Sequence, residues 1–319
     1  MDFLITGGAG FIGSHLVEHL TGKGASVRVV DNFATGKRAN LAPFLDRMEL
    51  IEGDITNPAV CAKACAGVDV VLHEAALPSV PKSVADPVTT HRANVDGTFN
   101  MLLAARDAGV RRFVYAASSS AYGETPTLPK VETMQSQPLS PYAVQKLTGE
   151  HYCVAFAKCY GLQTLCVRYF NVFGPRQDPT SQYAAAIPAF ITAIMQNRPP
   201  TVYGDGEQTR DFTFVENVVR ANLLAAQARQ VNGEVINVAC GEHVTVNAIC
   251  GEINRLLGKN VQPTHVATRP GDIKHSWADI NLAGRLIGYR PTVSFAEGLQ
   301  RTVEWYARTS GTEATAQRE

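Results

Sequence analysis

Short apolar runs alternate along the chain with segments in which apolar residues recur every three or four positions. The runs are rich in Val, Ile and Leu and end near Gly, Asp or Ser, which is typical of strands buried on both faces of a parallel sheet. In the first half they lie at residues 2–6, 27–30, 48–51, 69–72 and 112–117. The clearest helical spacing follows the first run, at Ile12, Leu16, Val17 and Leu20. This alternation predicts an α/β fold built on a doubly wound parallel sheet.

One further apolar run, Val235-Ile236-Asn237-Val238, comes late in the chain. We expect it to be one more strand of the first sheet, so that the chain completes its first domain only after visiting a second one. The predicted organisation is a domain over residues 1–170, completed by a strand near 235–240, and a smaller interleaved C-terminal domain over most of 171–308. The polar segment 309–319 is predicted to be a mobile tail.

A glycine-rich turn separates the first predicted strand from the first helix. In Gly-x-x-Gly-x-x-Gly, Gly7 permits the tight turn, Gly10 lets the backbone approach a pyrophosphate, and Gly13 lets helix and strand pack closely. The helix start also offers free N–H groups to phosphates. Asp31, at the end of the second strand, would hydrogen bond the adenosine ribose and repel a 2′-phosphate. The pattern predicts a Rossmann-type domain that binds NAD in preference to NADP.

The stretch from Ser140 to Lys146 carries the candidate catalytic base. Ser140 can cap a helix and Pro141 suits its first position, so Tyr142 and Lys146 share one helix face. An ammonium roughly 4 Å from a phenol can lower the phenol pKa from about 10 by up to about three units. We therefore expect Tyr142 to titrate near neutrality, where a general base is most useful. The spacing alone also fits an amphipathic helix with an unrelated Tyr and Lys.

A serine cluster, Ser118-Ser119-Ser120, follows the strand-like run at 112–117. It should reach the carboxyl edge of the sheet, where ligands bind in open α/β folds. A hydroxyl there could bond a substrate oxygen and relay its proton toward Tyr142. The alternative is a hydroxyl-rich turn that caps its own backbone.

Composition excludes several classes of protein. Among the 319 residues, Lys+Arg and Asp+Glu balance at 29 each, so no global basic field recruits nucleic acid or an acidic membrane. No apolar run is long enough to span a bilayer, and the N-terminus is typical of a strand rather than a signal peptide. The seven cysteines contain no Cys-x-x-Cys pair, which favours reduced thiols in a cytoplasm. His15-x-x-Glu18-His19 fits a metalloprotease pattern but lacks a third ligand, so no metal is predicted.

These motifs, in this order, resemble the extended short-chain dehydrogenase/reductase family, especially its nucleotide-sugar epimerases, from Met1 to about Tyr306. The resemblance implies that Ser118, four residues before Tyr122, acts with Tyr142 and Lys146 in catalysis. Dehydratases of that family carry Asp-Glu after the catalytic hydroxyl. Here Ser119 and Ser120 occupy those positions and would face the substrate, which argues against dehydration. The cofactor contacts expected are Gly7, Gly10, Phe11, Ile12, Gly13, Asp31, Asn32, Asp54, Ile55, Ala75, Asn94, Tyr142 and Lys146.

The second half resembles the family's nucleotide-sugar domain. The substrate contacts that this implies are Asn171, Tyr203, Arg210, Arg269 and Asp272, together with Ser79, Lys82 and Ser276 from the sugar pocket. Guanidinium groups suit phosphate oxygens, and two of them could neutralise a diphosphate. Either arginine could instead form a surface ion pair.

The activity implied is NAD-dependent C4 epimerisation of a UDP-sugar through a transient 4-keto sugar. The small Ser276 and the loop at 77–83 favour a pocket that accepts UDP-N-acetylglucosamine/galactosamine and also UDP-glucose/galactose. The alternatives are an epimerase restricted to non-acetylated sugars, a UDP-uronate 4-epimerase, and a non-catalytic NAD-binding sensor. Family resemblance also implies a homodimer through the helices that follow Asn94 and Pro141.

Overall fold

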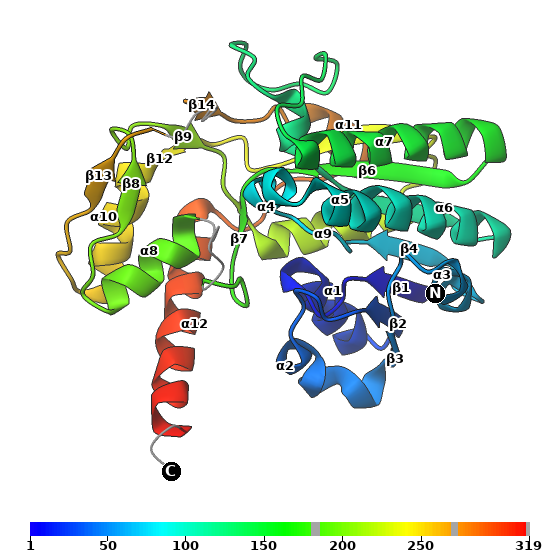
Figure 1. Cartoon of the computed structure of the whole chain (residues 1–319), viewed down its shortest axis with the longest axis horizontal. Helices are drawn as coiled ribbons and strands as arrows, with labels where there is room; N and C mark the ends of the chain where they lie inside the picture. Colours follow the sequence, from blue (N-terminus) through cyan, green and yellow to red (C-terminus); the bar gives the residue numbers. More distant parts are fainter. Residues whose placement is uncertain (180–185, 269–273, 317–319) are drawn as a thin grey trace.

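A seven-stranded parallel sheet forms the centre of the protein, seen in a computed structural model that describes residues 1–179, 186–268 and 274–316 (Figure 1). Its order is β11-β6-β5-β4-β1-β2-β3, and all neighbouring strands run parallel. The strands are β1 (Asp2–Thr6), β2 (Ser26–Asp31), β3 (Glu49–Glu52), β4 (Val70–His73), β5 (Arg112–Ser118), β6 (Gln163–Tyr169) and β11 (Glu234–Val238). The predicted doubly wound sheet is confirmed.

Helices cover both faces of this sheet. One core packs α1 (Phe11–Gly22), α9 (Val215–Gln227) and α11 (Asn281–Ile287) against one face. The other face carries α3 (Pro58–Cys65), α6 (Gly97–Asp107) and α7 (Pro141–Tyr160). Short turns of helix lie between these elements: α2 (Arg38–Leu41), η1 (Ala42–Arg47), α4 (Val80–Ala85), α5 (Pro87–His91), the π-helix η2 (Arg92–Asp96) and η3 (Ser119–Tyr122).

A smaller lobe has its own apolar core, in which the rings of Phe173, Phe212, Phe214 and Phe295 meet. Its helices are α8 (Ala186–Met195), α10 (Val246–Leu257) and α12 (Phe295–Ala316), which projects from the lobe toward the C-terminus (Figure 1). Short strands accompany them: β7 (Val172–Phe173), β8 (Thr201–Tyr203), β9 (Thr209–Arg210), β10 (Thr213–Phe214), β12 (Val244–Thr245), β13 (Thr264–Val266) and β14 (His275–Ser276). The polar segment from Thr309 is helical as far as Ala316.

The two lobes are interleaved in the chain. After β6 the chain enters the smaller lobe, and it returns as β11, which pairs with β6 at the edge of the main sheet. The buried carboxylate of Asp211 fastens this return. It accepts hydrogen bonds from the backbone N–H groups of Cys240 (2.9 Å), Gly241 (3.0 Å) and Ala278 (3.2 Å). Segments that are far apart in the sequence therefore meet at the junction between the two lobes.

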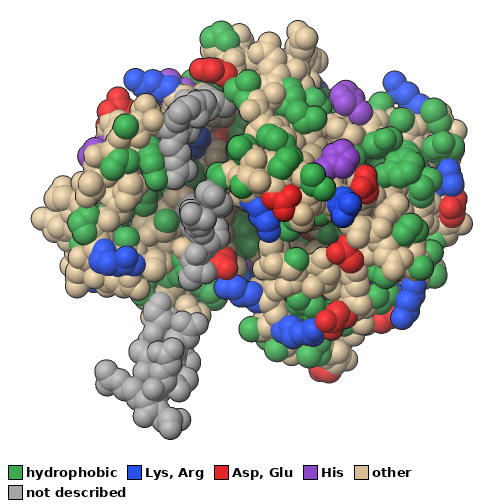
Figure 2. All heavy atoms as spheres, viewed as in Figure 1, with side chains coloured by type: hydrophobic (Ala, Val, Ile, Leu, Met, Phe, Trp, Pro, Cys, Tyr) green, Lys and Arg blue, Asp and Glu red, His purple; other side chains and the backbone are tan. Residues whose placement is uncertain are grey.

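The surface and the thiols are unremarkable in their chemistry. Acidic and basic side chains are interspersed on the face drawn in Figure 2. All seven cysteines lie in the described residues and are free thiols. Within the part of the chain that is described, no helix combines the length and apolar content needed to cross a bilayer.

Candidate active site

The glycine loop between β1 and α1 is too tight for side chains. Gly7 has φ +68°, and a Cβ placed on it would lie 2.8 Å from the Ala75 Cα. A Cβ on Gly13 would lie 2.2 Å from the Gly7 carbonyl oxygen. Gly10, at the N-cap of α1, brings no side chain to cap that helix. The loop thus leaves the first N–H groups of α1 open to a phosphate ligand, as the motif predicts.

Asp31 holds the same loop from the end of β2. Its Oδ2 accepts a hydrogen bond from Ala9 N (2.9 Å) and its Oδ1 accepts one from Phe33 N (2.8 Å). Burial raises the pKa of this carboxyl, while the two N–H donors oppose the rise. Next to it, Asn32 Nδ2 donates to Asp54 Oδ2 (2.7 Å), so three residues predicted for the adenosine end lie together.

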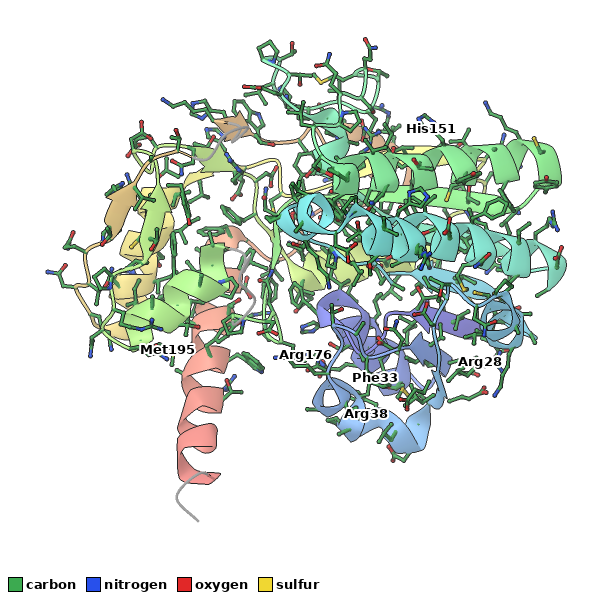
Figure 3. The ribbon with its side chains drawn as sticks, in the orientation of Figure 1. Arg28, Phe33, Arg38, His151, Arg176 and Met195 are labelled. Carbon is green, nitrogen blue, oxygen red and sulfur yellow. The ribbon has the colours of Figure 1, made fainter. Side chains whose placement is uncertain are left out.

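Close to Asp31 and Asn32, an arginine forms a cation–π contact with a phenylalanine. The Arg38 guanidinium stacks over the Phe33 ring at 4.1 Å from its centroid (Figure 3). Ile55, also predicted as a cofactor contact, has its side chain in the core under α6, and its carbonyl accepts from Asn100 Nδ2 (3.2 Å). Its side chain therefore belongs to the core, and contact of Ile55 with the cofactor stays a prediction.

Asn94 sits in the π-helix η2 and is almost fully buried. Its Oδ1 accepts from Leu77 N (2.7 Å), and its Nδ2 donates to Gln145 Oε1 (2.8 Å). Gln145 Nε2 in turn donates to Thr90 Oγ1 (3.0 Å). Asn94 therefore ties α7 to the loop that leads into α4, and direct contact with a cofactor stays a prediction for it.

Helix α7 begins as predicted. Ser140 Oγ accepts from Ala143 N (3.2 Å), and Pro141 occupies the first turn. The sequence did not reveal a second tie: Ser83, buried in α4, accepts a hydrogen bond from Tyr142 N (3.0 Å). No spacing rule links these two residues, because they meet only through the packing of α4 on α7.

The pKa of Tyr142 differs from the value expected from the sequence. Burial raises the pKa of Tyr142 to about 12, and a hydrogen bond with Ser118 opposes this. Lys146 Nζ donates to the Ala116 carbonyl (2.8 Å), and burial lowers its pKa to about 8. The prediction that Lys146 brings Tyr142 close to neutrality is wrong for the protein without ligands. Desolvation outweighs the nearby charge because both groups lie in the interior.

Ser118 is the last residue of β5. It caps the turn that follows and also contacts Tyr142, so it fits both the structural and the catalytic interpretation of the serine cluster. Its Oγ accepts from Ser120 N (3.2 Å) and from Ser120 Oγ (2.8 Å), which caps η3. It also shares a hydrogen bond with Tyr142. Ser119 and Ser120 lie beside it, both partly exposed. The structure thus brings Ser118, Tyr142 and Lys146 together at the carboxyl edge of the sheet.

Glu74 lies at the same edge and was missed by sequence reasoning. It directly follows β4, and its Oε1 accepts a hydrogen bond from Tyr169 Oη (2.7 Å) at the end of β6. Burial raises the pKa of Glu74 to about 7. The available signal was an acid just after the apolar run Val70-Val71-Leu72 and His73, at the edge where ligands bind.

The predicted substrate residues lie on both lobes. Ser79 caps α4 by accepting from Lys82 N (3.2 Å), and the Lys82 side chain is exposed. Ser276 on β14 pairs directly with Arg210 on β9, so these two residues are neighbours.

Of the other predicted substrate contacts, Asn171 and Tyr203 belong to the described residues. Asn171 adopts φ +32° and donates to the Asp211 carbonyl (3.0 Å), and Tyr203 ends β8. Arg269 and Asp272 lie outside the described residues.

The histidine pattern in α1 serves a contact between the lobes. His15 Nε2 lies 3.0 Å from the Pro175 carbonyl, and Arg176 contacts His15 Nδ1 (2.6 Å) and the Glu18 carboxylate. Burial and the Arg176 charge lower the pKa of His15 to about 4. Figure 3 shows Arg176 lying at the junction with α1. These side chains join the segment after β7 to the helix behind the glycine loop.

A glycine loop on a Rossmann-type sheet, with a serine, a tyrosine and a lysine gathered at its carboxyl edge, defines a dinucleotide-dependent enzyme of the short-chain dehydrogenase/reductase class. The chain belongs to the NAD dependent epimerase/dehydratase family, whose sequence model matches residues 3–239. Its cofactor is NAD. The cradle at Gly7 and Gly13, which an added Cβ would fill, and the uncapped start of α1 fit a dinucleotide pyrophosphate.

The chain is similar over nearly its whole length to nucleotide-sugar enzymes. The UDP-glucose 4-epimerase of Mycolicibacterium smegmatis is 36% identical over 97% of this chain and 100% of its own. A UDP-N-acetylglucosamine 4-epimerase structure from Methanobrevibacter ruminantium M1 superposes with TM-score 0.92 at 41% identity, covering 97% and 98% of the two chains. A UDP-glucuronic acid 4-epimerase from Bacillus cereus, in complex with UDP-glucuronic acid and NAD, gives TM-score 0.90 at 34% identity, covering 97% and 100%.

Proposed function

We propose that this chain catalyses NAD-dependent C4 epimerisation of UDP-sugars through a transient 4-keto sugar. The observation that carries the proposal is the meeting of Ser118, Tyr142 and Lys146 beside the glycine loop. Three similar proteins named above are 4-epimerases of UDP-sugars, which supports the same reaction here.

Distinct groups would hold the cofactor. The loop residues Gly7, Gly10, Phe11, Ile12 and Gly13 would hold its pyrophosphate, Asp31 the adenosine ribose and Lys146 the nicotinamide ribose. Bound NAD⁺ supplies the acceptor for the C4 hydride and the donor that returns it to the opposite face of the sugar. No net oxidation results, so the cofactor should remain bound through turnover.

The proton is handled by the chain's own side chains. Ser118 would hydrogen bond the C4 hydroxyl, and Tyr142 as phenolate would take its proton and later return it. Burial raises the pKa of Tyr142 to about 12, so binding of the cofactor has to favour its ionised form. The positive charges of Lys146 and of the oxidised cofactor both act in that direction.

A firm hold on the diphosphate would leave the 4-keto sugar free to turn. Asn171, Arg210 and Arg269 would hold the diphosphate, and Tyr203 and Asp272 the nucleoside. Ser79, Lys82, Ser119, Ser120 and Ser276 would line the sugar pocket. Because Ser276 is small and adjoins Arg210, we propose that the pocket admits an N-acetyl group. The similarity to a UDP-N-acetylglucosamine 4-epimerase supports this choice.

The decisive experiment is product analysis by NMR with no NAD added. The substrates are UDP-glucose, UDP-galactose, both N-acetylhexosamine counterparts and UDP-glucuronic acid. We expect interconversion within both neutral pairs and no turnover of the uronate. Turnover of the UDP-glucose pair alone would indicate an epimerase restricted to non-acetylated sugars. Turnover of UDP-glucuronic acid would favour the uronate alternative. No product from any of them, in a protein that retains NAD, would reject the proposal in favour of a non-catalytic sensor.

A further inference from the structure

A carboxyl group in the active site has no part in the reaction proposed above. Glu74 Oε1 accepts from Tyr169 Oη, which itself accepts from Asn222 Nδ2 of α9 (2.7 Å). Tyr169 and Asn222 are buried, and the Glu74 backbone packs against Gly7 of the phosphate loop. Neutral partners thus hold Glu74 in place at the ends of β4 and β6, without cancelling its charge.

Lys146 is a buried cation whose hydrogen-bond and ring contacts are with neutral groups. Its Nζ donates to the Ala116 carbonyl (2.8 Å) and lies 5.0 Å from the centre of the Tyr115 ring. None of the ion pairs formed among the described residues includes Lys146. The carboxylate one turn further along α7, Glu150, is already bound by Arg168 through hydrogen bonds of 2.8 and 2.7 Å. An ammonium in such surroundings needs a counter-charge to remain ionised.

We propose that Glu74 is a positioning residue that supplies the counter-charge of Lys146 and so keeps it an ammonium. The register of β4 and β5 places His73 opposite Tyr115, so Glu74 and Ala116 follow side by side, and the Ala116 carbonyl is the one that binds Lys146 Nζ. Burial lowers the pKa of Lys146 to about 8, and the first influence opposing it is the charge of Glu74. Burial raises the pKa of Glu74 to about 7, and Tyr169 and Lys146 oppose that rise. Catalytic consequences rest on the role proposed above for Lys146, whereas the charge pairing does not.

The other titratable groups around the pair do not take over this role. They come from β4, β5, β6 and α7, and comprise His73, Tyr115, Tyr169, Glu150 and Cys153. Burial lowers the pKa of His73 to about 3, so it is neutral. Burial also raises the pKa of both tyrosines, and Arg168 neutralises Glu150. Tyr142, four residues before Lys146 on α7, has its pKa raised to about 12 by burial and is neutral as well. Glu74 comes first among the groups whose charge supports Lys146, ahead of Glu150 and Cys153, and no ion pair among the described residues includes it.

The test measures the ionisation of Lys146 directly, without substrate. Lysine labelled with ¹³C at Cε reports the charge on Nζ, and the Lys146 signal is assigned by its loss in Lys146→Arg. We expect Glu74→Gln to move the Lys146 midpoint to lower pH by about one pH unit or more. Glu74→Asp should restore part of the shift. The matched control, Glu52→Gln, removes an exposed carboxylate paired with Arg38 at the end of β3 and should change nothing. An unchanged midpoint in Glu74→Gln overturns the proposal.

Tyr169→Phe provides a second route if Glu74→Gln does not fold. Loss of the phenol donor raises the pKa of Glu74 further, so the Lys146 midpoint should again fall, and an unchanged midpoint overturns the proposal. In active protein, the alkaline limb of kcat/KM should shift to lower pH in Glu74→Gln, an effect that a purely structural role would not produce. Because the NMR titration needs no turnover, a lack of epimerase activity would count against the proposed function and leave this result intact.

Discussion

At the scale of single residues, Tyr142 shows how burial and charge compete. A lysine four residues away suggests a lowered pKa, yet burial raises the pKa of the phenol to about 12. Desolvation is the largest influence on this pKa, and Lys146 Nζ donates its hydrogen bond to the Ala116 carbonyl. Ionisation of Tyr142 therefore needs a further influence that favours the phenolate, such as the positive charge of a bound oxidised cofactor.

Tyr142→Phe tests that role with little disturbance to packing. The substitution removes one oxygen that hydrogen bonds Ser118, so we expect kcat to fall by about 10²–10⁴, the usual contribution of a general base. NAD bound per protein, measured after acid release, should stay at the wild-type level. Loss of bound NAD in parallel with activity would contradict the catalytic assignment.

Ser276 provides a residue-scale test of sugar choice. It lies in register with Arg210, so a larger side chain there would project next to the proposed diphosphate contact. We expect Ser276→Tyr to lower kcat/KM for the N-acetylated pair by at least about 10-fold, as steric rejection of a small group typically gives. UDP-glucose turnover should change much less. Ser276→Ala, which keeps the space, is the control, and equal losses for both sugar pairs in Ser276→Tyr would refute the pocket hypothesis.

At the scale of elements, the join between the lobes depends on Asp211. Its carboxylate binds N–H groups that lie 29, 30 and 67 residues further along the chain. Asp211→Ala leaves those donors unpaired, and we expect the free energy of unfolding to fall by about 3 kcal/mol or more. Urea denaturation followed by circular dichroism measures it. Asp205→Ala, which removes an exposed acid in the same segment, is the control and should lower the free energy of unfolding far less. Equal effects of the two variants would contradict the assigned role.

The elements also show what the sequence can and cannot predict. Strands β1 to β5 and β11, the capped start of α7 at Ser140 and the glycine loop follow from local pattern, because apolar spacing and capping involve residues close in sequence. The ties made by Ser83, Asp211 and Glu74 depend on tertiary packing and could not be read from spacing. For the same reason, the direction of the Tyr142 pKa shift was predicted wrongly: pairing is visible in the sequence, and burial is not.

At the scale of the whole molecule, the outer face of α6 and α7 lacks a partner in the single chain. Val144 is 48% exposed, and His151 and Ala155, which follow it at helical spacing along α7, are exposed as well. Figure 3 shows His151 on the outer side of this helix. Burying such a face against a second copy removes apolar surface from water, which favours association. The family resemblance points to the same two helices, so we expect a homodimer that pairs α6 and α7 of each copy.

Light scattering coupled to size-exclusion chromatography tests this with one substitution in the middle of the face. Ala155→Arg places a charge on the exposed stripe of α7 that carries Val144 and His151, two turns or more from the catalytic pair, and a buried unpaired charge opposes association strongly. We expect wild-type dimers and Ala155→Arg monomers that retain bound NAD, since the cofactor site lies at the sheet edge of each copy. Ala307→Arg, an equally exposed position on α12 of the smaller lobe, should remain dimeric. Monomeric wild type would remove the basis for the dimer. Dissociation by Ala307→Arg alone would instead place the interface on the smaller lobe.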